Sequence, residues 1–415
     1  MDPHARRRDL VRRQKADDVK INPLQTQPHS ALSELVGDTG QTESVPIPAK
    51  KILVFSTLGT GSNEERRIYE LLSAYSPVVF PFDRSHKGRS WRALWRVLKE
   101  SRPDLVVLEG TGIFGGAALM LGRILLGLPY VVSSGDAVGP WIGTRSRLLQ
   151  PMFAVYERVL YRLASGFIGW TPYLAGRALT FGTPRAMTAP GWAPFRCSKD
   201  EARDARDAMR ASLGIAPSTI VVGIAGSLIW SKKWSKNRGY CYGAELIQAA
   251  IRCQRPDVCW LIVGDGDGKP HLEQAAKSVK SGRVIFTGRV PQSELPAYLA
   301  AMDIGSLPQS VDGVGSFRYT TKVSEYLAFR LPFVTSQIPL AYDFPSQWLW
   351  RLPGTKPWGD AYVTALANLV EQISWEEIHQ KRDEIPDQID IFDRDRQIER
   401  ATGFIGDILS ASGRL

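Results

Sequence analysis

Short apolar runs alternate with helical patterns in two successive series along this 415-residue chain. The first series contains KKILVFSTLG (50–59), PVVFPF (77–82), DLVVLEG (104–110), PYVVSSG (129–135), GFIGWT (166–171) and RAMTAPG (185–191). The second begins at STIVVGIAGSL (218–228) and continues through LIVGDGD, VIFTGRV, MDIGSLP and PFVTS. Strands that alternate with helices predict a parallel sheet covered by helices on both faces. We therefore expect an α/β protein with two such sheets.

The domain organisation follows from the same pattern. Residues 1–48 mix charge, Gln, Ser and Pro without periodicity, which predicts a disordered extension. Residues 49–195 and 196–378 form the two predicted Rossmann-like domains, and a chain of this length can bury both cores. Residues 379–415 are predicted to be a connector and a terminal helix over 394–409.

Positive charge is concentrated in the first domain. The formal net charge is +10, and residues 51–200 hold 19 Lys and Arg against 10 Asp and Glu. Trp91, Leu94, Trp95 and Leu98 form an apolar stripe opposite Arg89, Arg92, Arg96 and Lys99. This pattern favours an anionic membrane surface as a partner, although the stripe can equally pack on its own sheet. Nucleic acid is not expected, because no known binding module is present.

Cysteine usage and hydropathy indicate the cellular compartment of the protein. The four cysteines show no C-x-x-C pair and no metal-like spacing with the five histidines, so we expect reduced, buried thiols. No apolar run reaches the roughly 20 residues of a spanning helix, and none follows the basic N-terminus as in a secretory signal. We predict a cytoplasmic protein, peripheral on the inner face of the plasma membrane.

Residues 311–334 carry the clearest site signal. A loop rich in Gly and Ser leads through a polar turn at 318–321 into a helix that contains Lys322 and Glu325. A helix N-terminus offers unpaired N–H groups to a diphosphate, and Lys322 adds a positive charge. Glu325, one turn further on, can accept hydrogen bonds from vicinal ribose hydroxyls. The segment therefore predicts a nucleotide-diphosphate site.

This segment resembles the nucleotide-sugar site of retaining GT-B glycosyltransferases, in particular glycosyltransferase family 4. The family pattern P-x-K-x-x-E-(Y/A)-(M/L)-A-x-G-x-P-(V/F)-(V/I) is matched by Lys322, Glu325, Tyr326, Leu327, Ala328, Pro332, Phe333 and Val334. The resemblance covers roughly residues 51–410 and is strongest from 220 to 336. It implies a GT-B fold, with two Rossmann-like domains facing a cleft and a C-terminal helix that crosses back to the first domain.

The resemblance also implies site residues. Those expected to bind the substrate are Gly59, Gly61, Gly226, Ser227, Gly264, Arg289, Tyr319, Thr320, Thr321, Lys322 and Glu325. Those expected in catalysis are Asp136, Lys232, Arg238 and Glu325. Ser227 stands where the family usually has Arg, and the family Lys corresponds to Lys232 or Arg238, depending on the direction of counting. Asp136 follows a strand where relatives place a His or Asp near the acceptor hydroxyl, but it can also be a helix N-cap.

Other cofactor chemistry is not expected. The G-x-G-x-x-G fingerprint fails after both Gly59 and Gly264, which argues against NAD or FAD. Asp265 and Asp267 could hold a divalent ion, but the family resemblance implies that this strand end binds no metal. We expect neither a metal nor another cofactor. Phe317 stands where the family often has a sugar-binding Glu, so the donor sugar is left open.

Together these features predict a hexosyltransferase-type enzyme, independent of metal. It would move a sugar from a nucleotide-diphosphate donor to a lipid-linked or polysaccharide acceptor with retention, in cell-envelope or exopolysaccharide biosynthesis. Two alternatives are a nucleotide-sugar epimerase of the same fold and a catalytically silent GT-B scaffold in polysaccharide assembly.

Overall fold

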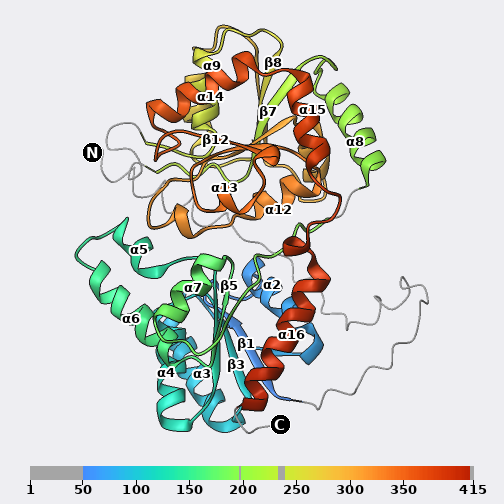
Figure 1. The fold of residues 1–415 in the computed structure, drawn as a ribbon. Helices are drawn as coiled ribbons and strands as arrows, with labels where there is room; N and C mark the ends of the chain where they lie inside the picture. The colour runs from blue at the N-terminus through green and yellow to red at the C-terminus, as the bar shows by residue number, and fades with distance from the viewer. Residues whose placement is uncertain (1–49, 196–197, 232–238, 412–415) are drawn as a thin grey trace, which may run out of the picture. The chain divides into compact units, whose positions relative to one another are not determined.

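The computed structural model describes residues 50–195, 198–231 and 239–411 (Figure 1). The predicted extension at 1–48 lies outside these residues. The first sheet has six parallel strands in the order β2-β1-β3-β4-β5-β6. They are β1 (Ile52–Ser56), β2 (Val78–Val79), β3 (Leu105–Glu109), β4 (Tyr130–Ser134), β5 (Gly166–Gly169) and β6 (Ala186–Thr188).

The second sheet is also parallel, with six strands in the order β12-β11-β10-β7-β8-β9. They are β7 (Ile220–Ala225), β8 (Val258–Val263), β9 (Arg283–Gly288), β10 (Ile304–Leu307), β11 (Phe333–Ser336) and β12 (Leu349–Leu352). Both sheets belong to one unit, Ile47–Leu415. The predicted fold class is therefore confirmed.

Helices cover both faces of the first sheet. One face carries α3 (Lys87–Ser101), α4 (Ile113–Leu126), α6 (Gln150–Leu163) and α7 (Pro172–Thr180), with the short α5 (Val138–Gly143) against α6. The other face carries α2 (Asn63–Leu71) and the terminal α16 (Arg394–Ala411). Ile405 and Ile408 of α16 pack into the core with Ile52, and the Gln397 amide binds the N–H and the C=O of Gly191 at 3.0 and 2.8 Å. The crossing of the last helix onto the first domain is thus confirmed (Figure 1).

The second sheet is covered in the same way. One face carries α9 (Ala244–Arg252), α10 (Lys269–Ala276), α14 (Asp360–Gln372) and α15 (Trp375–Glu384). The other carries α8 (Lys199–Ser212), α11 (Leu295–Ala301), α12 (Thr321–Ala328) and α13 (Leu340–Asp343). Short 3₁₀ helices complete the described elements: η1 (Ser73–Tyr75), η2 (Gly315–Phe317), η3 (Ser346–Trp348) and η4 (Asp390–Phe392).

Two further expectations concern buried and spanning segments. Cys241, Cys253 and Cys259 are free, buried thiols, as predicted, while Cys197 lies outside the described residues. Among the residues that the structure describes, no helix combines the length and the apolar character that crossing a membrane requires.

Candidate functional site

Two loops meet closely at the carboxyl ends of β7 and β8. Gly226 and Gly264 have φ values of +151° and +138°, which only glycine adopts readily. The Gly226 N–H donates to Val263 at 2.9 Å, and a Cβ on Gly264 would lie only 2.0 Å from the Gly226 oxygen. Glycine at both positions is therefore required by the packing of the two loops.

Lys322 of α12 lies against this crossing. Its Nζ is 3.0 Å from the position that a Cβ on Gly226 would occupy, and 5.2 Å from the centre of the Tyr242 ring. No carboxylate of the described residues forms an ion pair with this ammonium group. The charge is positioned by backbone and ring contacts, and it remains available to an anion.

The start of α12 offers further donors beside Lys322. Thr320 is the N-cap in an extended conformation, and its side chain makes no capping hydrogen bond. Its Oγ1 is buried and has no hydrogen-bond partner in the part of the chain that the structure describes. Together with the free N–H groups of a first helical turn, this hydroxyl makes the N-terminus of α12 suited to an anion.

Glu325 lies one turn further along α12. Burial raises the pKa of its carboxyl, and the nearby Lys322 ammonium opposes that rise. None of the described residues donates a hydrogen bond to this half-buried carboxylate. A desolvated carboxylate without donors is unfavourable, so ligand hydroxyls would stabilise it.

A cavity of about 570 Å³ lies at the carboxyl ends of the strands of the first sheet. Apolar walls come from Leu58, Phe82, Ile113, Phe114, Trp141, Ile142, Phe153 and Trp170. Its ionisable lining consists of Glu64, Arg84, Lys87, Glu109, Asp136 and Arg318. Tyr319 and Thr320 also line it, so the start of α12 borders this cavity. The cavity thus combines apolar walls with charges of both signs.

Asp136 and Arg318 form an ion pair at 2.5 Å in the lining of this cavity. Burial lowers the pKa of Arg318, but the Asp136 carboxylate outweighs it and the net shift is upward. The N-cap of α5 is Ala137, so the N-cap alternative for Asp136 does not hold. The ion pair instead joins the loop after β4 to the segment that precedes α12.

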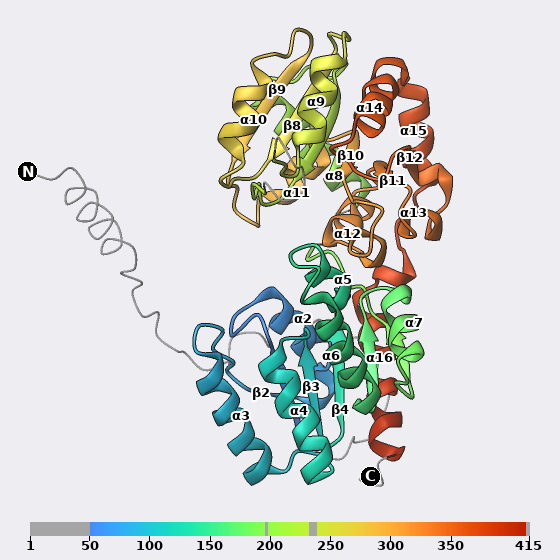
Figure 2. The ribbon, with the colours of Figure 1, turned by 90° about the vertical axis from the view of Figure 1, so that its left-hand side faces the viewer.

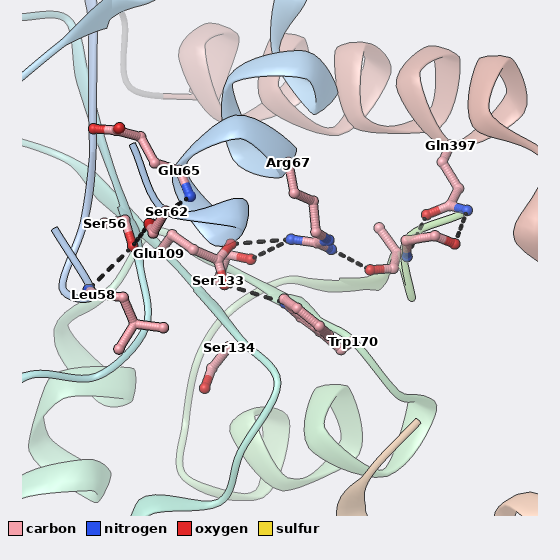
Figure 3. Close-up of polar contacts among 12 residues, drawn as sticks. Ser56, Leu58, Ser62, Glu65, Arg67, Glu109, Ser133, Ser134, Trp170 and Gln397 are labelled. Atoms are coloured by element: carbon pink, nitrogen blue, oxygen red, sulfur yellow. Dashed lines mark hydrogen bonds and ion pairs between the residues drawn. The ribbon is translucent and has the colours of Figure 1, made fainter. Parts of the chain in front are cut away.

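A buried ion pair that the sequence did not reveal joins Arg67 to Glu109, which lines this cavity (Figure 3). The Arg67 guanidinium donates to Glu109 at 3.0 Å, to Ser133 at 3.3 Å and to the backbone oxygen of Ala189. Trp170 Nε1 donates to the other Glu109 oxygen at 3.2 Å, and the Arg67 guanidinium stacks 4.5 Å from the Trp170 ring. Burial raises the pKa of Glu109, which Arg67 opposes. The position of Glu109 at the end of a buried strand was the one available signal.

Other predicted site residues lie at the edges of the α12 site and of the cavity. Gly59 and Gly61 form a tight turn with φ of +99° and +79°, and neither lines the cavity. Ser227 and Arg289 are exposed. Tyr319 is buried, and its hydroxyl donates to Asp343. Lys232 and Arg238 lie outside the described residues.

Phe317 takes a structural position. Its ring packs against the core of the first sheet, and its backbone oxygen accepts from Thr171 at 3.0 Å. The side chain therefore serves packing where the family often has an acid. Asp265 accepts from the Gly266 N–H at 2.8 Å and Asp267 from the Trp230 N–H at 2.7 Å, so both carboxylates organise their own loops.

Comparison with known families decides the assignment. The profile described as Glycosyl transferases group 1 matches residues 220–345, and the profile described as Glycosyl transferase 4-like domain matches residues 3–190. The chain belongs to the group 1 glycosyltransferases. This family assignment agrees with the resemblance found in the 311–334 segment.

Two curated glycosyltransferases are similar in sequence. The 2-deoxystreptamine glucosyltransferase of Streptomyces kanamyceticus is 29% identical over 220 residues, which is 48% of this chain and 52% of that protein. The 2-deoxystreptamine N-acetyl-D-glucosaminyltransferase of Streptomyces fradiae is 25% identical over 230 residues, 52% of this chain and 51% of that protein. The chain thus spans about half of the length of the curated relatives that it matches.

Solved structures share the GT-B glycosyltransferase fold. Anabaena HepE, in complex with UDP and glucose, has a TM-score of 0.61 at 17% identity, with 87% of this chain and 100% of that chain covered. Sucrose-phosphate synthase from Thermosynechococcus elongatus has a TM-score of 0.63 at 12% identity, with the same coverage. At such identities the likeness establishes the fold alone.

Proposed function

We propose that this protein is a glycosyltransferase that moves a sugar from a nucleoside-diphosphate donor to an acceptor bound in the 570 Å³ cavity. One observation carries the proposal: the ammonium group of Lys322 lies at the Gly226–Gly264 crossing, one turn from the Glu325 carboxylate, to which none of the described residues donates a hydrogen bond. A diphosphate next to Lys322 would place a ribose within reach of Glu325. Family membership and the UDP-glucose complex of HepE support a nucleotide-sugar donor.

The proposed transfer breaks the bond between the anomeric carbon and the donor phosphate oxygen, and forms a bond from that carbon to the acceptor oxygen. Lys322 and the N-terminus of α12 stabilise the negative charge that develops on the departing diphosphate. The departing phosphate oxygen takes the proton of the acceptor hydroxyl, which is the scheme for retention. Because these groups supply the neutralisation, no metal is required.

The acceptor is placed in the cavity because the cavity borders the start of α12 and presents hydrogen-bonding groups beside apolar walls. Asp136 orients the acceptor hydroxyl, while its ion pair with Arg318 holds the carboxylate in place. A lipid-linked or saccharide acceptor presents such hydroxyls. The similar Streptomyces enzymes are named for 2-deoxystreptamine, which also makes a small polyhydroxylated acceptor a candidate.

The test measures binding of UDP and GDP by calorimetry to the wild type, Glu325→Gln and Lys322→Gln. Each hydrogen bond to a charged partner contributes roughly 1.5–3 kcal/mol, so the Glu325 variant should bind its nucleotide at least about tenfold more weakly. Glu376→Gln, at an exposed position of α15, is the matched control. Unchanged affinity in Glu325→Gln would contradict the ribose contact.

A second measurement addresses the reaction itself. Incubation with a panel of nucleotide sugars and EDTA should release nucleoside diphosphate when an acceptor is present. Conversion of the donor to its sugar epimer without acceptor would indicate the epimerase alternative. Nucleotide binding without any turnover would indicate the scaffold alternative. Turnover that depends on added magnesium or manganese would contradict metal independence and return attention to Asp265 and Asp267.

A further inference from the structure

The outer face of α4 is apolar along its whole length. Ile113 and Phe114 at its start are exposed, and at its end Ile124 and Leu125 keep 66% and 62% of their surfaces accessible. Arg123 is the only ionisable residue of this helix. A surface helix normally presents polar groups to water, so this face is unusual for a layer that faces solvent.

The neighbouring α6 continues the apolar surface. Met152, Val155 and Val159 are exposed at helical spacing, and Val155 keeps 63% of its surface accessible. Helices α4 and α6 pack against each other, and Figure 2 looks onto them side by side with the strands behind. We call this patch the α4–α6 surface: Phe114, Ile124, Leu125, Met152, Val155 and Val159. Large apolar side chains exposed on two packed helices are typical of an interaction site.

Cations surround the α4–α6 surface. Within residues 87–185, all of which the structure describes, exposed carboxylates are few: Glu100, and Asp136, whose side chain is 41% accessible but paired with Arg318. Arg123 and Arg162, at the ends of α4 and α6, line one hollow of about 650 Å³. Arg158 is exposed on α6 between the apolar side chains. The rim of the patch is therefore complementary to an anionic partner.

Helix α3 lies in the same layer beside α4, and only its basic side faces outward. Leu94 and Leu98 are fully buried, and Trp91 and Trp95 pack against the core of the first sheet. The apolar stripe of α3 is thus occupied by its own sheet, as the alternative in the sequence allowed. Its outward residues Arg89, Arg92, Arg96 and Lys99 are exposed beside α4.

We propose that the layer of α3, α4 and α6 docks on an anionic lipid bilayer. The side chains of the α4–α6 surface enter the boundary between headgroups and acyl chains, while the surrounding arginines and Lys99 contact lipid phosphates. The positive rim disfavours binding of a second copy of this protein to the α4–α6 surface, because a face-to-face pair would bring like charges together. Phe114 also lines the 570 Å³ cavity, so the cavity opens at the edge of the docked face. If the proposed function holds, a lipid-linked acceptor enters from there.

The experiment sediments the full chain with vesicles of phosphatidylcholine alone or with phosphatidylglycerol added. Binding should rise with the phosphatidylglycerol content and fall between about 0.05 M and 0.5 M salt, since the attraction is screened. The triple variant Met152→Ser, Val155→Ser, Val159→Ser should bind at least about tenfold more weakly, because it loses most of the apolar contact of α6. Arg123→Gln with Arg162→Gln should lose about 30-fold, at roughly one fivefold factor per cation.

Tyr69→Ser is the matched control, because Tyr69 is exposed on α2 over the opposite face of the sheet. Circular dichroism should show every variant folded, as the replaced side chains are exposed. Wild-type protein that ignores anionic vesicles at low salt would overturn the proposal. So would binding that the triple variant retains in full, or self-association that the triple variant abolishes. Docking is measured without any substrate, so its failure is separate from a failure of the proposed glycosyl transfer.

Discussion

Replacing Arg67 by methionine should destabilise the first domain through the carboxylate that it leaves behind. Arg67 and Glu109 keep only 9% and 2% of their surfaces accessible. The guanidinium donates to Glu109, Ser133 and the Ala189 oxygen, so α2, β3, β4 and the segment after β6 all meet at this group (Figure 3). Methionine fills much of the volume but offers none of these donors.

The magnitude follows from the burial of the pair. Removing one partner of a buried ion pair costs about 3–5 kcal/mol, because the other charge stays desolvated. Glu109→Gln should cost somewhat less, since the amide oxygen still accepts from Arg67. The double variant leaves no orphaned charge, so its cost should fall below the sum of the two single costs by about 2 kcal/mol.

Urea unfolding at several pH values measures this cycle. Burial already raises the pKa of Glu109 against the pull of Arg67, and losing Arg67 raises it further. A carboxyl with a raised folded pKa stabilises the fold below its unfolded pKa, and that contribution is lost as the pH rises through the folded value. The deficit of Arg67→Met should therefore shrink in acid. A cost below about 1 kcal/mol, or single costs that add within about 0.5 kcal/mol, would refute the reasoning.

Three further predictions concern stability and reactivity. Burial raises the pKa of Glu245 to about 7, so wild-type stability should fall by about 3 kcal/mol between pH 4.5 and 7 relative to Glu245→Gln, and parallel pH profiles in urea would contradict this. Gly264→Ala should unfold the second domain at lower urea because its Cβ would meet the Gly226 oxygen at 2.0 Å, whereas Gly176→Ala, with open space in α7, should gain about 0.5–1 kcal/mol. Burial raises the pKa values of Cys253 and Cys259 to about 11, so peptide mass spectrometry after alkylation at mildly alkaline pH should find both unmodified in the folded protein, and rapid labelling would show that they are accessible.

The order of strands and helices could be predicted because it is a local property. Continuous apolar runs identified the buried strands, and Lys322 and Glu325 were found because one helical turn brings both into a single motif. Strand β12 was not predicted, because its sequence, LWRL, contains the charged residue Arg351. An edge strand with half-buried residues can accommodate such a side chain. Its apolar signal was too short to distinguish from a loop.

Contacts between distant segments could not be predicted in this way. The bond from Arg318 to Asp136 spans 182 residues and that from Arg67 to Glu109 spans 42. Although Glu109 ends a buried strand, neither the apolar period nor turn chemistry indicates which charged residue it meets, and the same holds for Arg318 and Asp136. The packing of Phe317 has the same origin, because its partners belong to the first sheet.

The helices of the first domain show why an apolar stripe does not by itself locate a docking face. In α3 the apolar stripe is narrow and the opposite side of the helix is basic. The helix therefore has a single apolar face, and this face packs on the sheet. In α4 apolar residues surround the helix, which by itself indicates burial on all sides. A helix in a layer over a sheet can bury only one side, so the excess remains on the surface. The apolar residues beyond those that the sheet can cover, rather than the clearest amphipathic pattern, therefore identify the face that is free to bind a bilayer.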